Sequence, residues 1–411
     1  MLGRSWAYCS VAHYNEAPEE QQKYRNQGVN RAIIETMQSI ANQQNSLCKQ
    51  ALQAETAADR PHAADLYREA IALDKSNPTP YLFLGFVLLG SGQEDAAAQV
   101  WSLAADLDSR LINAWRNDAV PDDIRLRSRA ADETVRRHFS ELHDDSMRVY
   151  REQYPAANIG RIEAAVWCQT HPSSFDYRTP EQRPHIFFVP ELPAIPVFSD
   201  EHIPWRHDLQ QAVDDIRREF IAAQAEKEAA PYVEMPASAL GDDWTPLAQS
   251  MNWSAFHVYK KGLAVDDMLA IFPATMAALD NVPLLQIDGN PSEVLFSVLQ
   301  GNKRIPPHYG LANTDVTVHL PIVTTTGSGI RVVDKSYDWE YGKVFAFDDA
   351  FIHESWNDNA EARVNLLFEA WHPDLSEHER GAVSATFAAR KQWTSLRTIA
   401  PASARSNSVA R

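Results

Sequence analysis

The chain has 411 residues, which is enough for two or three domains that each bury a core of their own. Hydrophobic residues make up 45% of it and charged residues 23%, as in an ordinary globular protein. The formal net charge of −17 opposes the electrostatic attraction that holds basic proteins on nucleic acid, so nucleic acid is not expected as a partner.

The sequence predicts neither a membrane span nor a secretory signal. The longest nearly apolar run, residues 81–89, is much shorter than the roughly 20 residues that a span requires. The N-terminal residues lack the apolar segment and small-residue cleavage site of a signal peptide. Cys9, Cys48 and Cys168 are too widely spaced for a disulfide framework or a CxxC metal motif. A cytoplasmic location is therefore expected.

Helices are expected over residues 28–115, because apolar and small residues recur there at spacings of three and four. Part of this pattern has the spacing of a tetratricopeptide repeat, with matching positions one repeat earlier. An ordinary helical hairpin remains an alternative, since two repeats are few for a solenoid. In either case the helices would pack or bind a protein partner. The positions that carry the pattern are Tyr81, Leu84, Gly85, Leu88, Ala97, Trp101 and Ala104, and earlier Ala63, Tyr67 and Ala70.

The second half of the chain reads as a β domain with flanking helices. Prolines in residues 184–205 favour extended chain, and an amphipathic helix is expected over 207–228. Short strands separated by turn residues then predict a sandwich or barrel. Ser376 and Glu379 form a possible capping box that opens a last helix. The expected strands are 293–299, 316–323, 329–333, 343–347 and 363–370.

The expected fold class is thus α+β, with an all-α N-terminal region in front of a β domain. Five segments are predicted along the chain. They are a helical extension over 1–50, tetratricopeptide-like repeats over 51–115, a charged helical connector over 116–160, the β domain over 161–392 and a disordered tail over 393–411.

The common cofactor and hydrolase motifs are absent from the sequence: it has no GxGxxG, GxxxxGK[ST], GxSxG or HExxH. Histidines near the expected strands remain as candidates for chemistry, among them His308, His319 and His353. A single histidine on a strand is more often a surface or packing residue than a metal ligand. Spacing alone therefore does not establish a metal site.

Two long blocks resemble the aspartyl/asparaginyl β-hydroxylase family. Residues 297–322 read SVLQGNKRIPPHYGLANTDVTVHLPI and contain a serine, an H-x-G and a second histidine in the family's order. Residues 339–375 contain the pattern G-K-x-x-x-F-D-D-x-F-x-H-E-x-W-x-D, a following arginine and a closing W-H-P. The resemblance extends over about residues 184–385. It implies a double-stranded β-helix of the jelly-roll or cupin kind, and a dioxygenase that uses Fe(II), 2-oxoglutarate and O₂.

The resemblance also implies the metal ligands. His308 and His353 are the expected iron ligands and catalytic residues, and imidazole suits Fe(II). The wider oxygenase class has a carboxylate ligand at the position of Gly310, and the glycine implies that water replaces it. Gly310 is expected either to leave room beside the iron or to adopt a backbone conformation with positive φ.

Further residues are expected around the iron. Arg363 is predicted to bind the distal carboxylate of 2-oxoglutarate, with Ser297 and His319 as additional contacts. The alternative for Arg363 is an exposed arginine on an edge strand. The family often has an arginine where this chain has Thr317, so cosubstrate contacts or substrate preference are expected to differ.

Two adjacent acidic residues precede the second metal ligand. Asp349, together with Asp348, is expected to accept hydrogen bonds from metal-bound water and so to assist catalysis, with a polar strand end as the equally weighted alternative.

The predicted reaction is hydroxylation of a C–H bond, by analogy with the family at the β-carbon of an aspartyl or asparaginyl residue in a peptide or protein. Small molecules, free amino acids and lipids remain alternative substrates on the same fold. A repeat scaffold with an inactive oxygenase domain is a further alternative, which the presence of His308, His353 and Arg363 disfavours.

Overall fold

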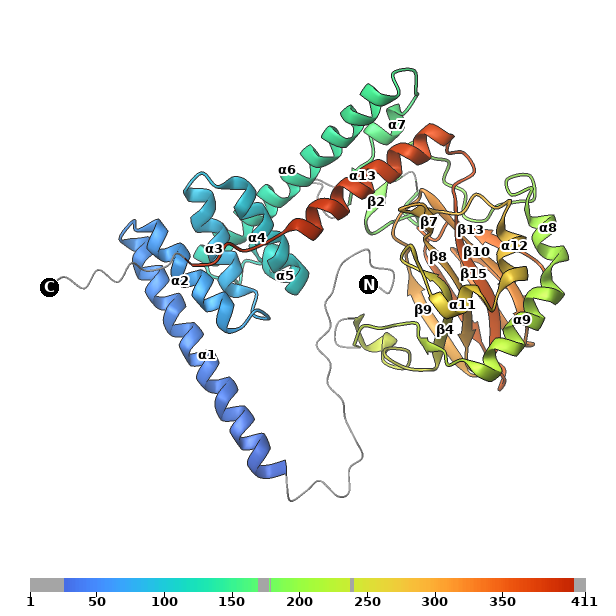
Figure 1. Cartoon of the computed structure of the whole chain (residues 1–411), viewed down its shortest axis with the longest axis horizontal. Coiled ribbons are helices and arrows are strands. Elements are labelled where there is room, and N and C mark those ends of the chain that lie inside the picture. The colour runs from blue at the N-terminus through green and yellow to red at the C-terminus, as the bar shows by residue number, and fades with distance from the viewer. Residues whose placement is uncertain (1–25, 169–176, 178, 237–239, 403–411) are drawn as a thin grey trace. The chain divides into compact units, whose positions relative to one another are not determined.

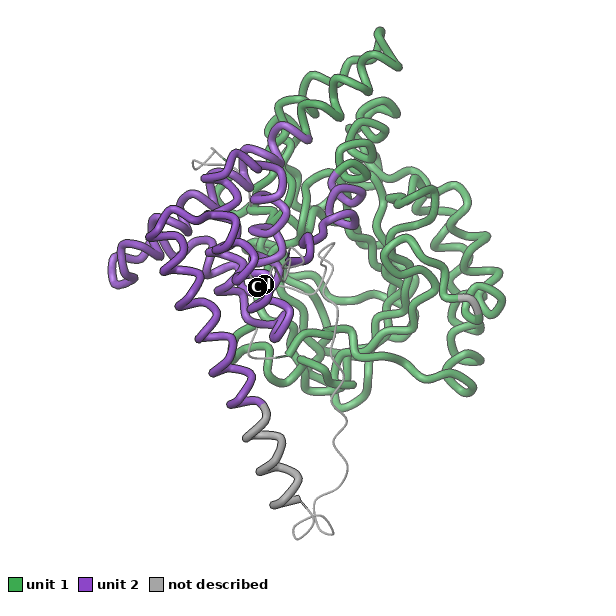
Figure 2. The backbone as a smooth tube through the Cα atoms, turned by 60° about the vertical axis from the view of Figure 1, so that its left-hand side comes forward, with its two compact units in different colours: residues 1–6, 143–389 green, residues 7–142, 390–411 purple. Residues whose placement is uncertain are grey.

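The computed structural model describes residues 26–168, 177, 179–236 and 240–402. The first part of the predicted helical extension and the end of the predicted tail lie outside these residues. The chain divides into two compact units (Figure 2). We call the described part of residues 143–389 the sheet unit, and that of residues 7–142 and 390–411 the helical unit. The division falls inside two long helices, α6 (Asp122–Gln153) and α13 (Glu377–Leu396).

The helical unit consists of successive helices that each pack against the next (Figure 1). Trp101 donates a hydrogen bond from Nε1 to the carbonyl oxygen of Leu82, and its ring lies where a side chain on Gly85 would be. The predicted helices over 28–115 are confirmed, whereas the assignment to tetratricopeptide repeats stays a prediction. The elements are α1 (Asn26–Thr56), α2 (Arg60–Leu73), α3 (Thr79–Gly90), α4 (Glu94–Leu107), α5 (Ser109–Ile112), η1 (Ala114–Arg116) and α6 (Asp122–Gln153).

Two antiparallel sheets form the centre of the sheet unit. The large sheet has the order β13 (Phe345–Phe347), β10 (Asp315–Val323), β15 (Arg363–Trp371), β8 (Glu293–Leu299), β4 (Trp253–Lys260) and β3 (Ala230–Pro231), with β5 (Leu263–Ala264) on β4. The small sheet has the order β12 (Lys335–Asp338), β11 (Ser328–Val332), β14 (His353–Asn357) and β9 (Lys303–His308). Two short ribbons pair β1 (Val166–Trp167) with β2 (Phe187–Phe188), and β6 (Gln286–Ile287) with β7 (Asn290–Pro291).

Successive strands alternate between the two sheets from β8 to β11 and again from β13 to β15. Such alternation is the pattern of a jelly roll. Side chains from the two sheets meet, since the ring of Phe347 on β13 lies 4.9 Å from that of His353 on β14. A helical region followed by an antiparallel sheet domain agrees with the predicted α+β class.

All five predicted strands are present, with ends that agree within two residues. Two strands that hold candidate ligands, β9 and β14, were not predicted. Strand β9 contains Pro306 and Pro307, which a central strand does not accommodate, but β9 lies at the edge of the small sheet, where prolines are tolerated.

The two faces of the large sheet differ in character. On β10 and β15 the alternate residues Val316, Val318, Leu366 and Phe368 belong to the largest apolar core, together with side chains of the neighbouring helices. The other face carries polar residues and points toward the small sheet. The helices of this unit are α7 (Gly160–Glu163), α8 (Arg206–Gln211), α9 (Val213–Glu226), α11 (Asp266–Leu269), α12 (Pro273–Leu279) and most of α13 (Glu377–Leu396), with the 3-10 turn η2 (Asp242–Trp244).

The last helix begins at an identifiable signal. The backbone N–H of Ser376 donates to Glu379 Oε2 at 2.8 Å, and the N–H of Glu379 donates to Ser376 Oγ at 3.3 Å, so the predicted capping box is confirmed. The helix continues to Leu396, and Arg397 pairs with Asp106 at 2.7 Å. The prediction that disorder begins at residue 393 is therefore wrong for its first residues. No helix in the described part of the chain is both long and apolar enough to cross a membrane.

Candidate active site

Two histidines meet where β9 and β14 lie side by side. His308 and His353 are direct partners in the strand register, and their ring centroids are 4.1 Å apart. Each Nδ1 lies 2.8 Å from the carbonyl oxygen of the residue two positions earlier, Pro306 or Phe351. Because a carbonyl oxygen only accepts, Nδ1 carries the proton in both rings. Each Nε2 then presents a lone pair, which is the form that binds a metal ion.

The two rings are a pair of nitrogen donors without a third protein ligand of the usual kind. Among the described residues, no group of three or more His, Cys, Asp or Glu side chains has the geometry to hold a metal ion. A borderline metal ion such as Fe(II) accepts two imidazoles with oxygen donors in its remaining positions. The donor set therefore fits iron bound by two histidines, with the remaining positions left to small ligands.

Gly310 is required for space and not for its φ angle. It is not among the glycines with positive φ, so that explanation is wrong. A β-carbon at Gly310 would overlap the carboxylate of Asp349. The Asp349 carboxylate thus occupies the space where a side chain at position 310 would begin, and Thr317 Oγ1 donates to its Oδ2 at 3.0 Å.

The neighbouring acid points elsewhere. Asp348 Oδ2 accepts from Gln182 Nε2 at 2.6 Å, and its Oδ1 accepts from the backbone N–H of Ala350 at 2.8 Å. Burial, followed by the charge of Asp349, raises the pKa of Asp348 to about 8. Of the two acids, only Asp349 lies beside Gly310.

Arg363 opens β15 and is buried, with 1% of its surface exposed. Its guanidinium makes only long hydrogen bonds, from Nη1 to Ser297 Oγ at 3.4 Å and from Nη2 to Ser355 Oγ at 3.3 Å. Its Nε has no partner in the described part of the chain, and no acidic side chain there offsets its burial. Burial lowers its pKa to about 9. Such a cation lacks a counter-ion, and the carboxylate of a small acid would supply one.

Other polar groups line the same interior. Ser297 Oγ also accepts from Trp253 Nε1 at 3.0 Å. His319 Nδ1 lies 3.2 Å from Asn365 Nδ2, while Asn365 Oδ1 has no partner among the described residues. Trp339 Nε1 also has no hydrogen-bond partner among the described residues, and the ring of Trp339 lies 4.9 Å from that of His319. These orphaned polar atoms, beside a buried cation, fit a polar ligand such as 2-oxoglutarate.

The structure brings all six predicted site residues to the inner side of the two sheets. His308 and His353 lie on the small sheet, and Ser297, His319 and Arg363 lie on the large sheet, while Asp349 follows β13. Sequence reasoning missed three further residues, Trp253, Trp339 and Asn365. Asn365 had a signal, because it lies two positions after Arg363 on a predicted strand and shares its face. Trp339 opens the second block that resembles the family, but it precedes the signature within that block, so nothing marked it as a site residue.

The sheet unit also matches known proteins. Residues 210–373 match the family model described as Aspartyl/Asparaginyl beta-hydroxylase. Residues 210–373 therefore form a domain of this family. All six predicted site residues lie inside the hydroxylase-family domain.

Three relatives show how far the likeness extends. The human "Aspartate beta-hydroxylase domain-containing protein 2" is 27% identical over 250 residues, which cover 59% of this chain and 64% of that protein. The human "Aspartyl/asparaginyl beta-hydroxylase" is 29% identical over 141 residues, or 34% of this chain and 18% of that protein. The "Ornithine lipid ester-linked acyl 2-hydroxylase" of Rhizobium tropici is 26% identical over 182 residues, or 43% of this chain and 61% of that protein. The chain thus spans less than two thirds of the length of each of these relatives.

Proposed function

We propose that this chain is an Fe(II)- and 2-oxoglutarate-dependent dioxygenase that hydroxylates a C–H bond. The observation that carries the proposal is Arg363, a buried cation without a counter-ion in the described residues, in the interior that also holds His308 and His353. A structural arginine at this depth would be expected to have an acidic partner. The membership of the domain in a hydroxylase family supports the same reading.

Each residue has a role in this proposal. His308 and His353 hold the iron through Nε2, with both rings oriented by their Nδ1 hydrogen bonds. Arg363 and Ser297 bind the distal carboxylate of 2-oxoglutarate. When bound, Fe(II), O₂ and 2-oxoglutarate supply the oxidising power for hydroxylation, and 2-oxoglutarate leaves as succinate and CO₂.

The remaining residues orient water and the cosubstrate and shield the metal ligands from bulk solvent. Asp349, fixed by Thr317, accepts a hydrogen bond from water on the side where Gly310 leaves no protein ligand. His319 adds a polar contact to the cosubstrate. The ring of Phe347 lies 4.9 Å from that of His353 and keeps bulk water from that side of the ligand.

The substrate is proposed by analogy to be an aspartyl or asparaginyl residue in a peptide or protein, hydroxylated at its β-carbon. A lipid or a small molecule is the second candidate, favoured by the likeness to the ornithine lipid hydroxylase. We further propose that the helical unit binds a protein partner and that the protein acts in the cytoplasm. The alternative is a catalytically inactive scaffold, which would form no succinate from 2-oxoglutarate.

The test is succinate formation from 2-oxoglutarate by the purified full chain with Fe(II). His308→Ala and His353→Ala are each expected to abolish iron retention and turnover, because only two protein ligands are available. Arg363→Gln is expected to weaken 2-oxoglutarate binding by about tenfold or more, since a charge-assisted pair of about 2 kcal/mol is lost.

Arg304→Gln is the matched control. This arginine lies on the small sheet, as the two histidines do, but it is exposed and pairs with Asp358 at 2.7 Å. It should keep both iron and cosubstrate affinity. Stoichiometric iron with full activity in either histidine variant, or unchanged 2-oxoglutarate affinity in Arg363→Gln, would refute the assignment.

A further inference from the structure

Asn365 is a buried amide on β15 that lies between groups assigned to the cosubstrate. In the strand register it is opposite Ser297 on β8, and it shares its face with Arg363, two positions earlier. On its other side, His319 of β10 is its diagonal neighbour, because the direct partner of His319 is Leu367. The exposed fraction of Asn365 is 0%. A polar side chain at this depth is expected to have a hydrogen-bonding role.

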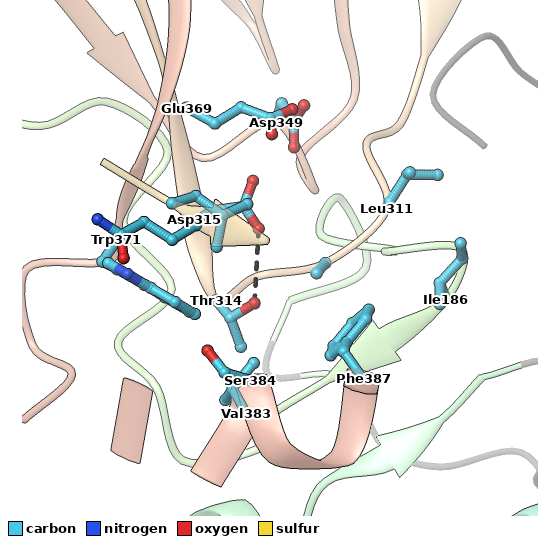
Figure 3. Close-up of a pocket in the computed structure, with 13 residues that line it drawn as sticks. Ile186, Leu311, Thr314, Asp315, Asp349, Glu369, Trp371, Val383, Ser384 and Phe387 are labelled. Atoms are coloured by element: carbon cyan, nitrogen blue, oxygen red, sulfur yellow. Dashed lines mark hydrogen bonds between the residues drawn. The ribbon is translucent and has the colours of Figure 1, made fainter. Parts of the chain in front are cut away.

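The place of Asn365 along β15 is near the cationic end of the inner face. Four positions further on, the same face carries Glu369, which lines a pocket together with Asp349 (Figure 3). Four residues of a strand span roughly 13 Å. Glu369 and the buried cation Arg363 therefore lie toward different ends of the strand, and an anionic ligand is attracted to the end that holds Asn365.

The side-chain amide of Asn365 has one partner in the described part of the chain. Its Nδ2 lies 3.2 Å from Nδ1 of His319, and its Oδ1 has no partner there. Because an amide nitrogen only donates, Nδ1 of the ring accepts. An uncharged imidazole that accepts at one nitrogen carries its proton on the other. The hydrogen bond therefore places the proton of His319 on Nε2.

This form of the ring is opposite to that of the two metal ligands. In His308 and His353, Nδ1 lies beside a carbonyl oxygen and carries the proton, so Nε2 offers a lone pair. In His319 the amide engages Nδ1 and the proton is on Nε2, so neither nitrogen offers a lone pair to a metal ion. Such a ring donates from Nε2 instead, which suits a carboxylate.

Resting on the proposed function, we infer that Asn365 is a positioning residue for the cosubstrate. It holds His319 with its proton on Nε2, so that the ring donates to a carboxylate of 2-oxoglutarate and does not bind the iron. Aromatic neighbours fix the plane of the same ring, since its centroid lies 4.9 Å from that of Trp339 and 5.9 Å from that of Phe347. Asn365 thus fixes the position of the proton, and the aromatic rings fix its direction.

Nitrogen-15 NMR of the full chain with labelled histidine observes the ring proton without iron or cosubstrate. The signals of His319 are those that disappear in His319→Gln. At pH 8 we expect the parent to have Nε2 protonated and Nδ1 unprotonated. Asn365→Asp, whose carboxylate only accepts, should bring a proton onto Nδ1. Asn302→Asp makes the same change of charge at an exposed turn and should leave the His319 signals unchanged.

Affinity for 2-oxoglutarate shows whether this proton position serves binding. The protein is loaded with Fe(II) without oxygen and titrated calorimetrically with 2-oxoglutarate. Asn365→Leu keeps the size of the side chain but neither donates nor accepts, so it should weaken binding by about tenfold, the scale of one hydrogen bond to a charged group. Glutamine at position 319 has an amide N–H near the place of Nε2. In the His319→Gln background, Asn365→Leu should therefore have little further effect.

Three outcomes overturn the inference: a parent ring protonated on Nδ1, an Asn365→Leu protein that binds 2-oxoglutarate like the parent, or an equal loss of affinity in the His319→Gln background. The NMR result on the parent decides the first of these whether or not the leucine variant folds. A parent that binds no 2-oxoglutarate would refute the proposed function as well. A parent that binds it with His319 protonated on Nδ1 would overturn this inference alone.

Discussion

Gly310 illustrates how one missing side chain shapes the candidate iron site. Its neighbour in space is the carboxylate of Asp349, and Thr317 holds that carboxylate in place. The carboxylate beside Gly310 thus comes from a different part of the chain, after β13.

Gly310→Ala should therefore displace Asp349 and lower both thermal stability and iron affinity. Gly310→Asp should have a larger effect, because it adds a like charge as well as bulk. Thermal melting and iron titration measure the two effects. Gly160→Ala is the control, since a β-carbon there would approach no atom closer than 3.9 Å. A Gly310→Ala protein that melts and binds iron like the parent would contradict this account.

Asp348 predicts a pH-dependent stability. Its pKa is raised to about 8 in the folded chain, above the ordinary value of 3.8, because burial disfavours the charged form. Its favourable contribution to folding is therefore complete below about pH 4 and is lost as the pH rises through 8. Asp348→Asn keeps an acceptor for the N–H of Ala350 and carries no charge.

Metal-free Asp348→Asn should consequently gain melting temperature relative to the parent as the pH rises from 5 to 9. Thermal melts of both proteins across that range measure the difference. If the difference in melting temperature between the two proteins stays constant or shrinks as the pH rises, Asp348 does not become charged in the folded chain over this pH range.

The site could be predicted from the sequence only where a residue type and a motif agreed. His308, His353 and Arg363 stood in such motifs, and all three lie in the interior. Asp348 and Asp349 could not be told apart, because adjacent residues differ only in the direction of their side chains. That direction depends on Gln182, which is far away in the sequence.

At the level of the elements, strand prediction depended on apolar alternation. Strands β8, β10 and β15 are rich in β-branched and apolar residues and were predicted with nearly correct ends. Strand β14 reads HESWN, and its buried positions are His353, Ser355 and Asn357. Because the inner face is polar, the usual pattern of a strand is reversed there. Because its buried residues are polar, β14 could not be predicted from apolar alternation.

The capping box of α13 gives a prediction for an element. Ser376→Ala removes the hydroxyl that accepts from the N–H of Glu379, so it should lower the free energy of unfolding by about 1 kcal/mol. Urea unfolding followed by circular dichroism measures it. Ser395→Ala near the other end of α13, where the hydroxyl only contacts the carbonyl of Gln392, should change little. Equal effects of the two substitutions would argue against a capping role for Ser376.

At the level of the whole molecule, the boundary between the helical unit and the sheet unit lies inside α6. His143 lies in the sheet unit, where its Nδ1 is 2.9 Å from Thr386 Oγ1 and its Nε2 is 3.1 Å from the carbonyl oxygen of Ile162. Met147 belongs to the same apolar cluster as Trp167 and several side chains of α13. The last turns of α6 therefore complete the core of the sheet unit.

A fragment that begins at residue 143 should accordingly fold and retain turnover of 2-oxoglutarate, because it keeps every residue assigned to the site together with this end of α6. A fragment that begins at residue 161 lacks His143 and Met147, so it exposes Trp167 and leaves Thr386 without its partner. It should melt at a lower temperature and lose activity on warming before the longer fragment does. Circular dichroism melts and succinate formation compare the two fragments with the full chain. If the shorter fragment matched the longer one in both, α6 would be only a connector; if the longer one failed to turn over 2-oxoglutarate while folded, the helical unit would contribute to the reaction.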